Sequence, residues 1–402
     1  MSFPSFAPWD ITPTTFAQLL DCYPATLKES YKRKLIAVVA RKHRKYPERL
    51  NREDPAFDRQ TNEYLQLDDW RYETLPRVLR QRAGEEGGDE EEKEEEKEES
   101  DGDDKKKKKK SKNKNNKKNE TVHLKQGEKY DSLFMHKDEL VKLMDWKLKH
   151  GRYRPALAGL IKTNKPELVR KTTAEAYKAL VDSIDTEPSR ESLDETFPKK
   201  SQDILMKPLR AVGTATASLI LAVRTEGRAN EIPFYSDEVY NWLCLDLFPG
   251  SEKNRWNYKK ATNRTREDGR LDVKYNMLEY RELYEEVCKL RHHLNNYKAD
   301  DDDDDDHKAR RQFSCSDVER VAYVLRNLDV SGFPHAAEIL EKHAAAESEA
   351  KKEFEKNKRS KRKSGANADD DEPEEEEILG VVPSKKRKAG FKESGRGKKK
   401  KV

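Results

Sequence analysis

The sequence predicts an all-α protein, a compact helical bundle with long disordered, charged inserts and a charged C-terminal tail. Several segments place apolar residues at helical spacing, and no segment of useful length alternates apolar and polar residues as a strand does. Charged residues make up 40% of the 402 residues, against about a quarter in an ordinary soluble domain. A large share of the chain therefore cannot bury enough apolar surface to fold, which excludes a single compact enzyme that fills the whole length.

The N-terminal region, residues 1–83, is expected to be partly ordered and helical and to pack on the core. Thr12-Pro13-Thr14-Thr15 forms a cap and first turn ahead of a first helix. A second helix with a basic polar side is predicted over 27–40, and a short helical element over 70–79. Residues 84–120 follow as a disordered insert, acidic first and then lysine-rich, because blocks of like charge repel themselves.

The segment 121–297 has the most regular apolar pattern and is predicted to be the helical core. Gly151 is expected to end one helix as its C′ residue, and Ser201 to cap another. The expected helices of the core cover residues 134–148, 157–161, 166–180, 201–209, 214–223, 236–247 and 275–290.

Beyond the core, a disordered acidic loop is expected over 298–310, where seven consecutive aspartates occur. Residues 311–340 are predicted to supply the terminal helix of the core, with Ser316 as its cap. The chain then becomes charged, and 345–402 is expected to be a disordered tail.

Several classes of protein are excluded by simple patterns. No run of 18 apolar residues exists, so no transmembrane span and no membrane partner is expected. The first residues lack the basic and apolar regions of a secretory signal. The four cysteines lie far apart, which indicates a reducing compartment rather than a disulfide framework or a zinc site. We therefore expect no metal and no cofactor.

The C-terminal tail carries basic clusters at 358–363 and 383–388 that are typical of nuclear localisation signals. They predict a nuclear protein that binds an import receptor through its basic tail. The acidic blocks are interpreted as solvated linkers that can also bind histones or other chromatin partners. The signal residues of the second cluster are Lys385, Lys386, Arg387 and Lys388.

The most informative segment, 205–221, is predicted to form a helix, a tight turn and a second, almost wholly apolar helix. Such a turn exposes backbone N–H groups at the N-terminus of the second helix, and these donors and the helix dipole together form an anion site. The alternative is a structural corner that uses glycine for a positive φ angle. The residues expected to contact nucleic acid here are Ala211, Val212, Gly213, Thr214 and Thr216.

This segment resembles the helix-hairpin-helix of a DNA glycosylase superfamily, in which a Gly/Pro-rich loop and a catalytic aspartate follow the hairpin. The family pattern is roughly leucine-x-glycine-hydrophobic-glycine-x-x-threonine-alanine, and Ala211 stands where the first glycine is expected. The resemblance continues through Pro233 to Asp237, at the start of a predicted helix. The residues that match the hairpin pattern are Leu209, Val212, Gly213, Thr216 and Ala217.

The resemblance implies that the hairpin amides grip a DNA phosphate, that a nucleotide is flipped into a pocket and that Asp237 is catalytic. Bifunctional members use a lysine two residues after the second glycine, where this chain has Ala215. No four-cysteine cluster follows the domain. Neither lyase chemistry nor an iron–sulfur cluster is therefore expected. The structural alternative for Asp237 is that any helix favours an acid in its first turn.

A second candidate interface is the basic stretch 142–154, which also carries aromatic residues. Such a stretch can follow a nucleic-acid backbone. The alternative is an amphipathic helix with Trp146 in the core and its lysines solvated. The predicted contacts are Lys147, Lys149, Arg152 and Arg154.

Together these patterns favour a nuclear DNA-binding protein with a glycosylase-like helix-hairpin-helix domain that is not catalytic. Two rivals stay open: a monofunctional DNA N-glycosylase that uses Asp237, and a chromatin-associated scaffold protein without specific DNA contacts. The position of Asp237 discriminates between them. A cleft that holds Asp237 beside the hairpin turn favours the enzyme, whereas a cleft without a positive rim favours the scaffold.

Overall fold

The structure is a computed structural model that describes residues 3–43, 51–85, 133–151, 154–181, 183–189, 191–258, 260, 265–266, 271–297 and 311–364. The predicted insert after Glu85, the loop over 298–310 and the signal at 385–388 lie outside these residues. Within them the protein is all-α, as the sequence predicts, apart from one isolated bridge between Thr265 and Leu271. The described residues up to Phe354 belong to one compact unit, and those from Glu355 to Ser364 belong to a second.

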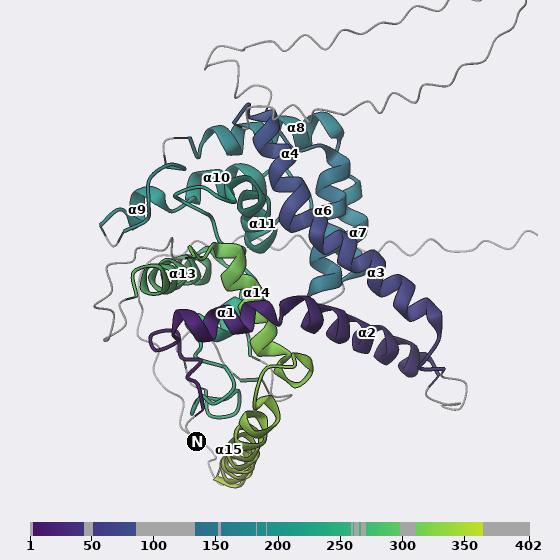
Figure 1. Cartoon of the computed structure of the whole chain (residues 1–402), viewed down its shortest axis with the longest axis vertical. Helices are drawn as coiled ribbons and strands as arrows, with labels where there is room; N and C mark the ends of the chain where they lie inside the picture. Colours follow the sequence, from purple (N-terminus) through teal and green to yellow (C-terminus); the bar gives the residue numbers. More distant parts are fainter. Residues whose placement is uncertain are drawn as a thin grey trace, which may run out of the picture. The chain divides into compact units, whose positions relative to one another are not determined.

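Most of the expected helices are present (Figure 1), and several are joined by only a few residues. The α-helices are α1 (Pro13–Asp21), α2 (Tyr23–Lys42), α3 (Pro55–Asp69), α4 (Leu75–Arg82), α6 (Lys137–His150), α7 (Pro155–Lys162), α8 (Pro166–Lys178), α9 (Leu193–Thr196), α10 (Lys199–Met206), α11 (Thr214–Thr225), α12 (Asp237–Val239), α13 (Met277–Asn295), α14 (Cys315–Arg326) and α15 (Ala336–Ser364). Two π-helical turns, Trp70–Thr74 and Tyr240–Cys244, and a 3₁₀ turn, Leu328–Val330, complete the helical elements.

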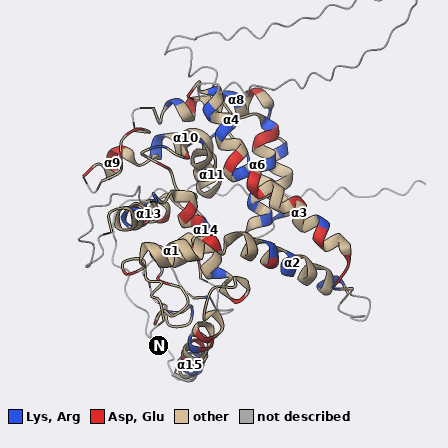
Figure 2. Ribbon diagram, in the orientation of Figure 1, with Lys and Arg blue, Asp and Glu red and all other residues tan. Residues whose placement is uncertain are grey.

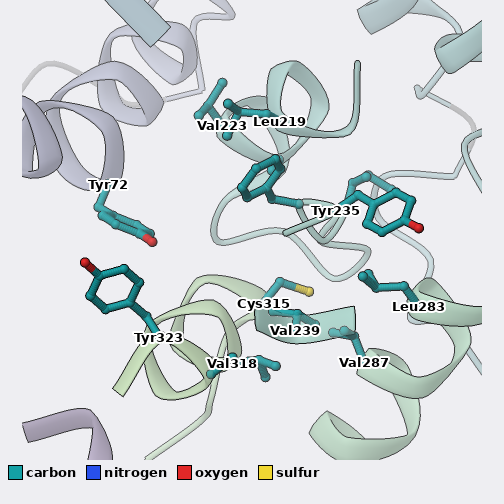
Figure 3. Packing of buried hydrophobic residues seen from close by; sticks show 14 of the residues in the cluster. Tyr72, Leu219, Val223, Tyr235, Val239, Leu283, Val287, Cys315, Val318 and Tyr323 are labelled. Carbon is teal, nitrogen blue, oxygen red and sulfur yellow. The ribbon is translucent and has the colours of Figure 1, made fainter. Parts of the chain in front are cut away.

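The core of the first unit is built around α14. This helix packs against α1 and α2 from the N-terminal region and against α12 and α13 from the middle of the chain. Figure 3 shows Val318 of α14 close to Val239 and Val287, and all three side chains are buried. The apolar helix α11 packs on α4, α10 and α13. The core thus joins helices of the N-terminal region, of the middle of the chain and of residues 311–340.

The N-terminal helices show how local sequence sets their start. Thr12 caps α1, because its Oγ1 accepts a hydrogen bond from the Thr15 N–H at 3.2 Å. Asp54 caps α3 in the same way through Ala56, and Pro55 follows at the first helical position. Helix α3 was not expected from the sequence, because its few apolar residues stand among acidic and amide side chains that hide the helical period.

Four local predictions are wrong. Ser201 and Ser316 lie inside α10 and α14, whose N-caps are Pro198 and Ser314. Gly151 does end α6, but its φ of −90° is not the left-handed value of a glycine C′ cap. The region expected to be a tail from residue 345 instead continues as helix α15 as far as Ser364.

Candidate functional site

Four segments that are distant in the sequence line one pocket of about 350 Å³. They are the end of α6 with the start of α7, the turn between α10 and α11 with the first residues of α11, the segment that leads into α12, and the residue Tyr275 ahead of α13. The lining residues are Lys147, Leu148, His150, Gly151, Arg154, Leu157, Ala211, Val212, Gly213, Thr214, Ala215, Thr216, Phe234, Tyr235, Ser236, Asp237, Glu238 and Tyr275.

The turn between α10 and α11 is held in shape by one buried side chain, Asn164. Its amide nitrogen donates to the Arg210 carbonyl oxygen at 3.0 Å, and its Oδ1 accepts from the Arg210 N–H at 2.9 Å. The next residue, Ala211, has a φ of 62°, which an L-residue adopts only at a cost. Gly213 has a φ of −105°. Gly213 therefore does not supply the positive φ that the structural alternative for this turn assumes, and Ala211 occupies the left-handed position.

Gly213 is instead the N-cap of α11, and its lack of a side chain leaves open space at the pocket. A Cβ atom built on it would meet no other atom within 4 Å. Thr214, which could have capped the helix, is its first residue, and its hydroxyl is directed at Met206 Sδ at 3.7 Å. The first amides of α11 thus border the pocket at the positive end of a 12-residue helix.

Asp237 stands at the start of α12, with its side chain exposed to the pocket. Ser236 caps this helix by accepting from the Val239 N–H at 3.1 Å. The Tyr275 hydroxyl donates to Asp237 Oδ1 at 2.8 Å. Burial beside the negative charge of Asp237 raises the pKa of Tyr275, so that this hydroxyl keeps its proton. The carboxylate is therefore fixed in orientation by a donor.

The segment that carries Asp237 is anchored from behind by hydroxyl groups of α11. Ser218 Oγ accepts from the Tyr235 N–H at 2.9 Å, and Thr225 Oγ1 accepts from the Ile232 N–H at 2.8 Å. The Tyr280 hydroxyl donates to the Pro233 carbonyl at 3.0 Å. These bonds connect the loop to two helices of the core, α11 and α13, and so set the position of the carboxylate.

Tyr275 itself has a strained backbone, with a φ of 53°. The buried carboxylate of Glu279 holds this conformation, because its Oε2 accepts from the Tyr275 N–H at 2.7 Å and from the Lys274 N–H at 3.0 Å. Ala211 and Tyr275 are two of the four non-glycine residues with positive φ in the described part of the chain, and both line the pocket. Such strain gathers at functional sites, where the surrounding structure enforces it.

Lys147 brings a partly buried amine into the pocket from α6. Its Nζ donates to Thr216 Oγ1 at 2.7 Å and lies 5.8 Å from the centre of the Phe234 ring. Burial lowers the pKa of Lys147 to about 7, although the nearby Asp237 charge acts in the opposite direction. Near neutral pH this side chain is therefore divided between the ammonium and the neutral amine.

The rest of α6 is held from behind by a buried polar network. Trp146 Nε1 donates to Asp68 at 2.8 Å, and His150 Nδ1 lies 2.9 Å from the Tyr64 hydroxyl. Burial lowers the pKa of His150 to about 3, so the ring stays neutral. Lys34 of α2 donates to the Lys149 carbonyl at 2.7 Å and to the carbonyl of Gly151, and its positive charge thus caps the C-terminal end of α6.

The predicted nucleic-acid contacts are only partly brought together. Lys147 and Arg154 line the pocket with the five residues of the turn, and Arg154 lies 5.5 Å from the centre of the Tyr275 ring. Lys149 does not line it and forms an ion pair with Asp145 at 2.9 Å. Arg152, like Lys385 to Lys388, lies outside the described residues.

Sequence reasoning missed Asn164, Phe234 and Tyr275. Asn164 follows a short helix in an ordinary turn sequence, and no pattern links it to a turn 46 residues later. An aromatic residue directly ahead of a helix gives no hint that its hydroxyl reaches an aspartate from another segment. Of these three residues, only Phe234 could have been found from the sequence, because it stands three residues before Asp237, the predicted catalytic residue.

Comparisons with known proteins return no match: no protein-family model, no curated protein and no solved structure resembles this chain closely enough to report. The resemblance of the hairpin to DNA glycosylases therefore stays a prediction. None of the described helices is both long and apolar enough to cross a membrane. In the same residues, no group of three or more His, Cys, Asp or Glu side chains is arranged to hold a metal ion.

Proposed function

We propose that the protein binds DNA through the turn between α10 and α11, receives an extruded nucleotide in the pocket and hydrolyses its N-glycosidic bond with Asp237. The observation that carries the proposal is that Asp237 and the residues of the turn line one pocket. A carboxylate that only stabilises the start of a helix does not have to line a cavity. We therefore prefer the enzyme over the non-catalytic DNA-binding protein that the sequence alone favours.

The chemistry of the pocket suits this reaction. When a base leaves a nucleotide, positive charge develops on the sugar, and a carboxylate can stabilise that charge or activate the attacking water. Tyr275 binds Asp237 Oδ1 and so restrains the carboxylate without neutralising it. Extrusion of a nucleotide costs stacking and pairing energy, and this cost is justified when chemistry on the nucleotide follows.

The edges of the pocket support binding to a polyanion. Lys147 and Arg154 bring an amine and a guanidinium to its lining, and Gly213 leaves open space beside the N-terminus of α11. Figure 2 shows further lysine and arginine residues along α2, whose Lys34 contacts the end of α6 next to the pocket. These basic side chains stand beside the acids Asp237 and Glu238 in the lining, and they favour DNA binding over a scaffold protein without DNA contacts.

A non-catalytic DNA-binding protein remains the second candidate, because Asp237 begins α12, where a carboxylate is favoured by the helix dipole alone. Nuclear localisation and the import receptor rest on the two basic clusters, of which 358–363 lies in α15 and 383–388 lies outside the described residues. Histone or chromatin partners rest on the acidic blocks after Glu85 and at 300–306, which also lie outside them. They remain proposals that follow from the basic and acidic blocks of the sequence.

The proposal is tested by an excision assay on duplexes that each carry one deaminated, alkylated or oxidised base. Abasic sites are revealed by cleavage in hot alkali. We expect excision by the full-length protein on at least one duplex and about a 100-fold or larger loss in Asp237→Asn, because an amide can neither stabilise the cationic sugar nor accept a proton from water. DNA affinity and thermal stability should stay unchanged, since asparagine suits a helix start nearly as well as aspartate.

Asp138→Asn is the matched control, because Asp138 is an exposed acid in the first turn of α6 and does not line the pocket. It should excise like the wild type. Equal excision by Asp237→Asn and the wild type would show that Asp237 takes no part in the reaction. No excision on any duplex, together with tight DNA binding, would favour the second candidate.

A further inference from the structure

We propose that the C-terminal part of α15 is a second DNA-binding element, which contacts the phosphate backbone as an ordered helix. The inference rests on the proposed function for its ligand, DNA, but needs neither the pocket nor Asp237. It gives the basic cluster 358–363 a role other than the import signal that the sequence predicts. The sequence predicts a disordered tail here, whereas in the structure α15 extends from Ala336 to Ser364.

The first part of α15 is attached to the core. Ile339 is buried there, and Glu347 forms an ion pair with Arg255 at 2.8 Å. The rings of Phe354 and Trp256 lie 5.6 Å apart, measured between their centres, and Phe354 is the last residue of the first compact unit. The same helix then continues without a break through the residues that follow Phe354.

The residues beyond Phe354 offer no apolar contact to a ligand. From Glu355 to Ser364 the chain has no apolar side chain, and after Glu355 it has no acid. A helix without an apolar face cannot bind by burying one in a hydrophobic groove or in the surface of a bilayer. This composition suits a polyanion, and duplex DNA carries one negative charge per about 1.7 Å of its axis. The cations of the segment are Lys356, Lys358, Arg359, Lys361, Arg362 and Lys363.

Three cations form a stripe along one face of α15. Lys352, Lys356 and Arg359 follow one another at intervals of four and three residues, which makes them neighbours on the helix surface. All three are exposed, and none of them forms an ion pair with another described residue. Like charges at this spacing repel one another and destabilise an isolated helix. A row of phosphates beside the stripe would replace that repulsion by attraction, which also favours a polyanionic ligand.

The dimensions of this helical segment fit a groove of DNA. An α-helix with its side chains is about 10–12 Å wide, and the major groove is about 12 Å wide. From Lys352 to Lys363 the helix rises by about 17 Å, which is about half a turn of the duplex. A helix in the groove has phosphates along both of its sides. Because lysine and arginine meet phosphates here, the contact should depend on salt and not on base sequence.

The test measures the affinity of the full-length protein for an undamaged fluorescent duplex, by anisotropy at several salt concentrations. The triple variant Lys352→Gln, Lys356→Gln, Arg359→Gln should bind more weakly. The slope of log Kd against log salt should fall by about 3, because each lost phosphate contact lowers it by nearly one. Glutamine favours a helix about as much as lysine and arginine do, so the helix should persist. Hydrogen exchange in the wild type should slow at amides 356–363 when the duplex is added.

Two substitutions of Ser360 separate an ordered helix from a simple accumulation of charge. Ser360→Pro keeps every cation but breaks the helix, because proline lacks the N–H and clashes with the preceding turn. It should weaken binding by about tenfold, since the cationic side chains must then be ordered when DNA binds. Ser360→Ala is the matched control. The Ser360 hydroxyl donates to the Asn357 carbonyl of the same helix at 2.9 Å, so its loss should leave the helix and the DNA affinity unchanged.

The outcomes for α15 and for the proposed function are separate. Equal affinity and equal salt slope of the triple variant and the wild type would overturn the inference without affecting the case for excision. Wild-type affinity of Ser360→Pro would also overturn it, because charge without a helix would then suffice. A triple variant that binds DNA normally but no longer enters the nucleus would assign the cluster to an import receptor instead. Weakened binding by the triple variant of a protein that excises no base would support the inference and count against the proposed function.

Discussion

Helix α6 has two polar neighbourhoods that differ in nearly every physical respect. Behind it, Asp68, Arg71 and Glu319 are buried. Arg71 and Glu319 form an ion pair, and Asp68 accepts hydrogen bonds from Trp146 and Tyr23. In front of it, the pocket combines an exposed carboxylate, an amine without an ion pair in the described residues and two residues with strained backbone. The first arrangement fixes a structure, whereas the second leaves groups available to a ligand.

The buried region is held together by a close ion pair. Arg71 donates to Glu319 at 2.8 Å, and its guanidinium stacks 3.9 Å from the centre of the Tyr72 ring. Burial raises the pKa of Glu319 to about 7 even though Arg71 counteracts it, and burial raises the pKa of Asp68 to about 6. Perturbed pKa values therefore occur on both sides of α6, and it is access to a cavity that distinguishes the candidate site.

The largest expected effect comes from breaking the buried pair. Glu319→Ala leaves the Arg71 charge buried without its partner and should lower the free energy of unfolding by about 3–5 kcal/mol. Urea denaturation measures this loss. The double variant Arg71→Met, Glu319→Leu should recover most of the stability. A double variant as unstable as the single one would show that the pair is not what stabilises this region.

The second prediction concerns Lys147 and pH. Its pKa of about 7 lies below the ordinary 10.5 of lysine, so between these values the unfolded chain holds a proton that the folded chain has released. Wild-type stability should therefore gain from this residue as pH rises from 7 to 10. Lys147→Met should be more stable than the wild type at pH 6, by about 1–3 kcal/mol for a partly exposed group.

This difference should shrink toward pH 10, as measured by urea denaturation at several pH values. The charged groups that face Lys147 are Asp237, Glu238 and Arg154, all in the pocket lining. They are present in both proteins, so their own titration cancels in the comparison to first order. Parallel stability curves at all pH values would contradict a lowered pKa for Lys147.

The third prediction concerns the turn. Gly213→Glu introduces a carboxylate beside the amides of α11, and its Cβ meets no atom within 4 Å at a φ that any residue adopts. Stability should therefore change little, whereas DNA affinity should fall by about 1–2 kcal/mol, the scale of one like-charge contact. Gly213→Gln, of the same size but uncharged, serves as the control in a binding titration at fixed salt. Equal DNA affinity of the wild type and both variants would show that the turn has a structural role and does not contact DNA.

The smallest effect is expected for Tyr275→Phe. This change removes only the hydroxyl that donates to Asp237 Oδ1 and keeps the ring and the backbone held by Glu279. Excision should fall by about tenfold, which corresponds to the loss of one hydrogen bond of about 1.4 kcal/mol to a charged group. Steady-state kinetics should show the change in kcat rather than in KM. A loss as large as that of Asp237→Asn would assign Tyr275 a part in the chemistry itself.

The sequence predicts the fold class and the position of the hairpin because both depend on local patterns. The apolar run after Gly213 could only be a buried helix, and Ser236 marked the start of the helix that carries Asp237. The backbone conformation of the turn was harder to predict from the sequence. Glycine is the residue expected to adopt a positive φ. Only tertiary contacts, such as the hydrogen bonds of Asn164 to Arg210, reveal that Ala211 adopts it instead.

The site as a whole could not be predicted, because it depends on segments that meet only in three dimensions. Lys147 belonged to a basic stretch together with Lys149, and nothing in the spacing separates the lysine that enters the pocket from the one that pairs with Asp145. The buried network was hidden for a similar reason. Charged residues in a sequence are expected at the surface, so Asp68, Arg71 and Glu319 gave no signal of their partnership.

The contact of Lys34 with the end of α6 bears on which fragment of this protein would keep the pocket and its support. Lys34 lies in α2, yet its amine binds the carbonyls of Lys149 and Gly151, and Gly151 is itself part of the pocket wall. Every residue of that wall lies within the central segment 121–297, which the sequence delimits as the core, but the lysine that caps α6 lies outside it. We therefore expect a fragment that retains the complete support of the site to begin ahead of α2 and, because α14 packs on both α2 and α12, to extend through α14.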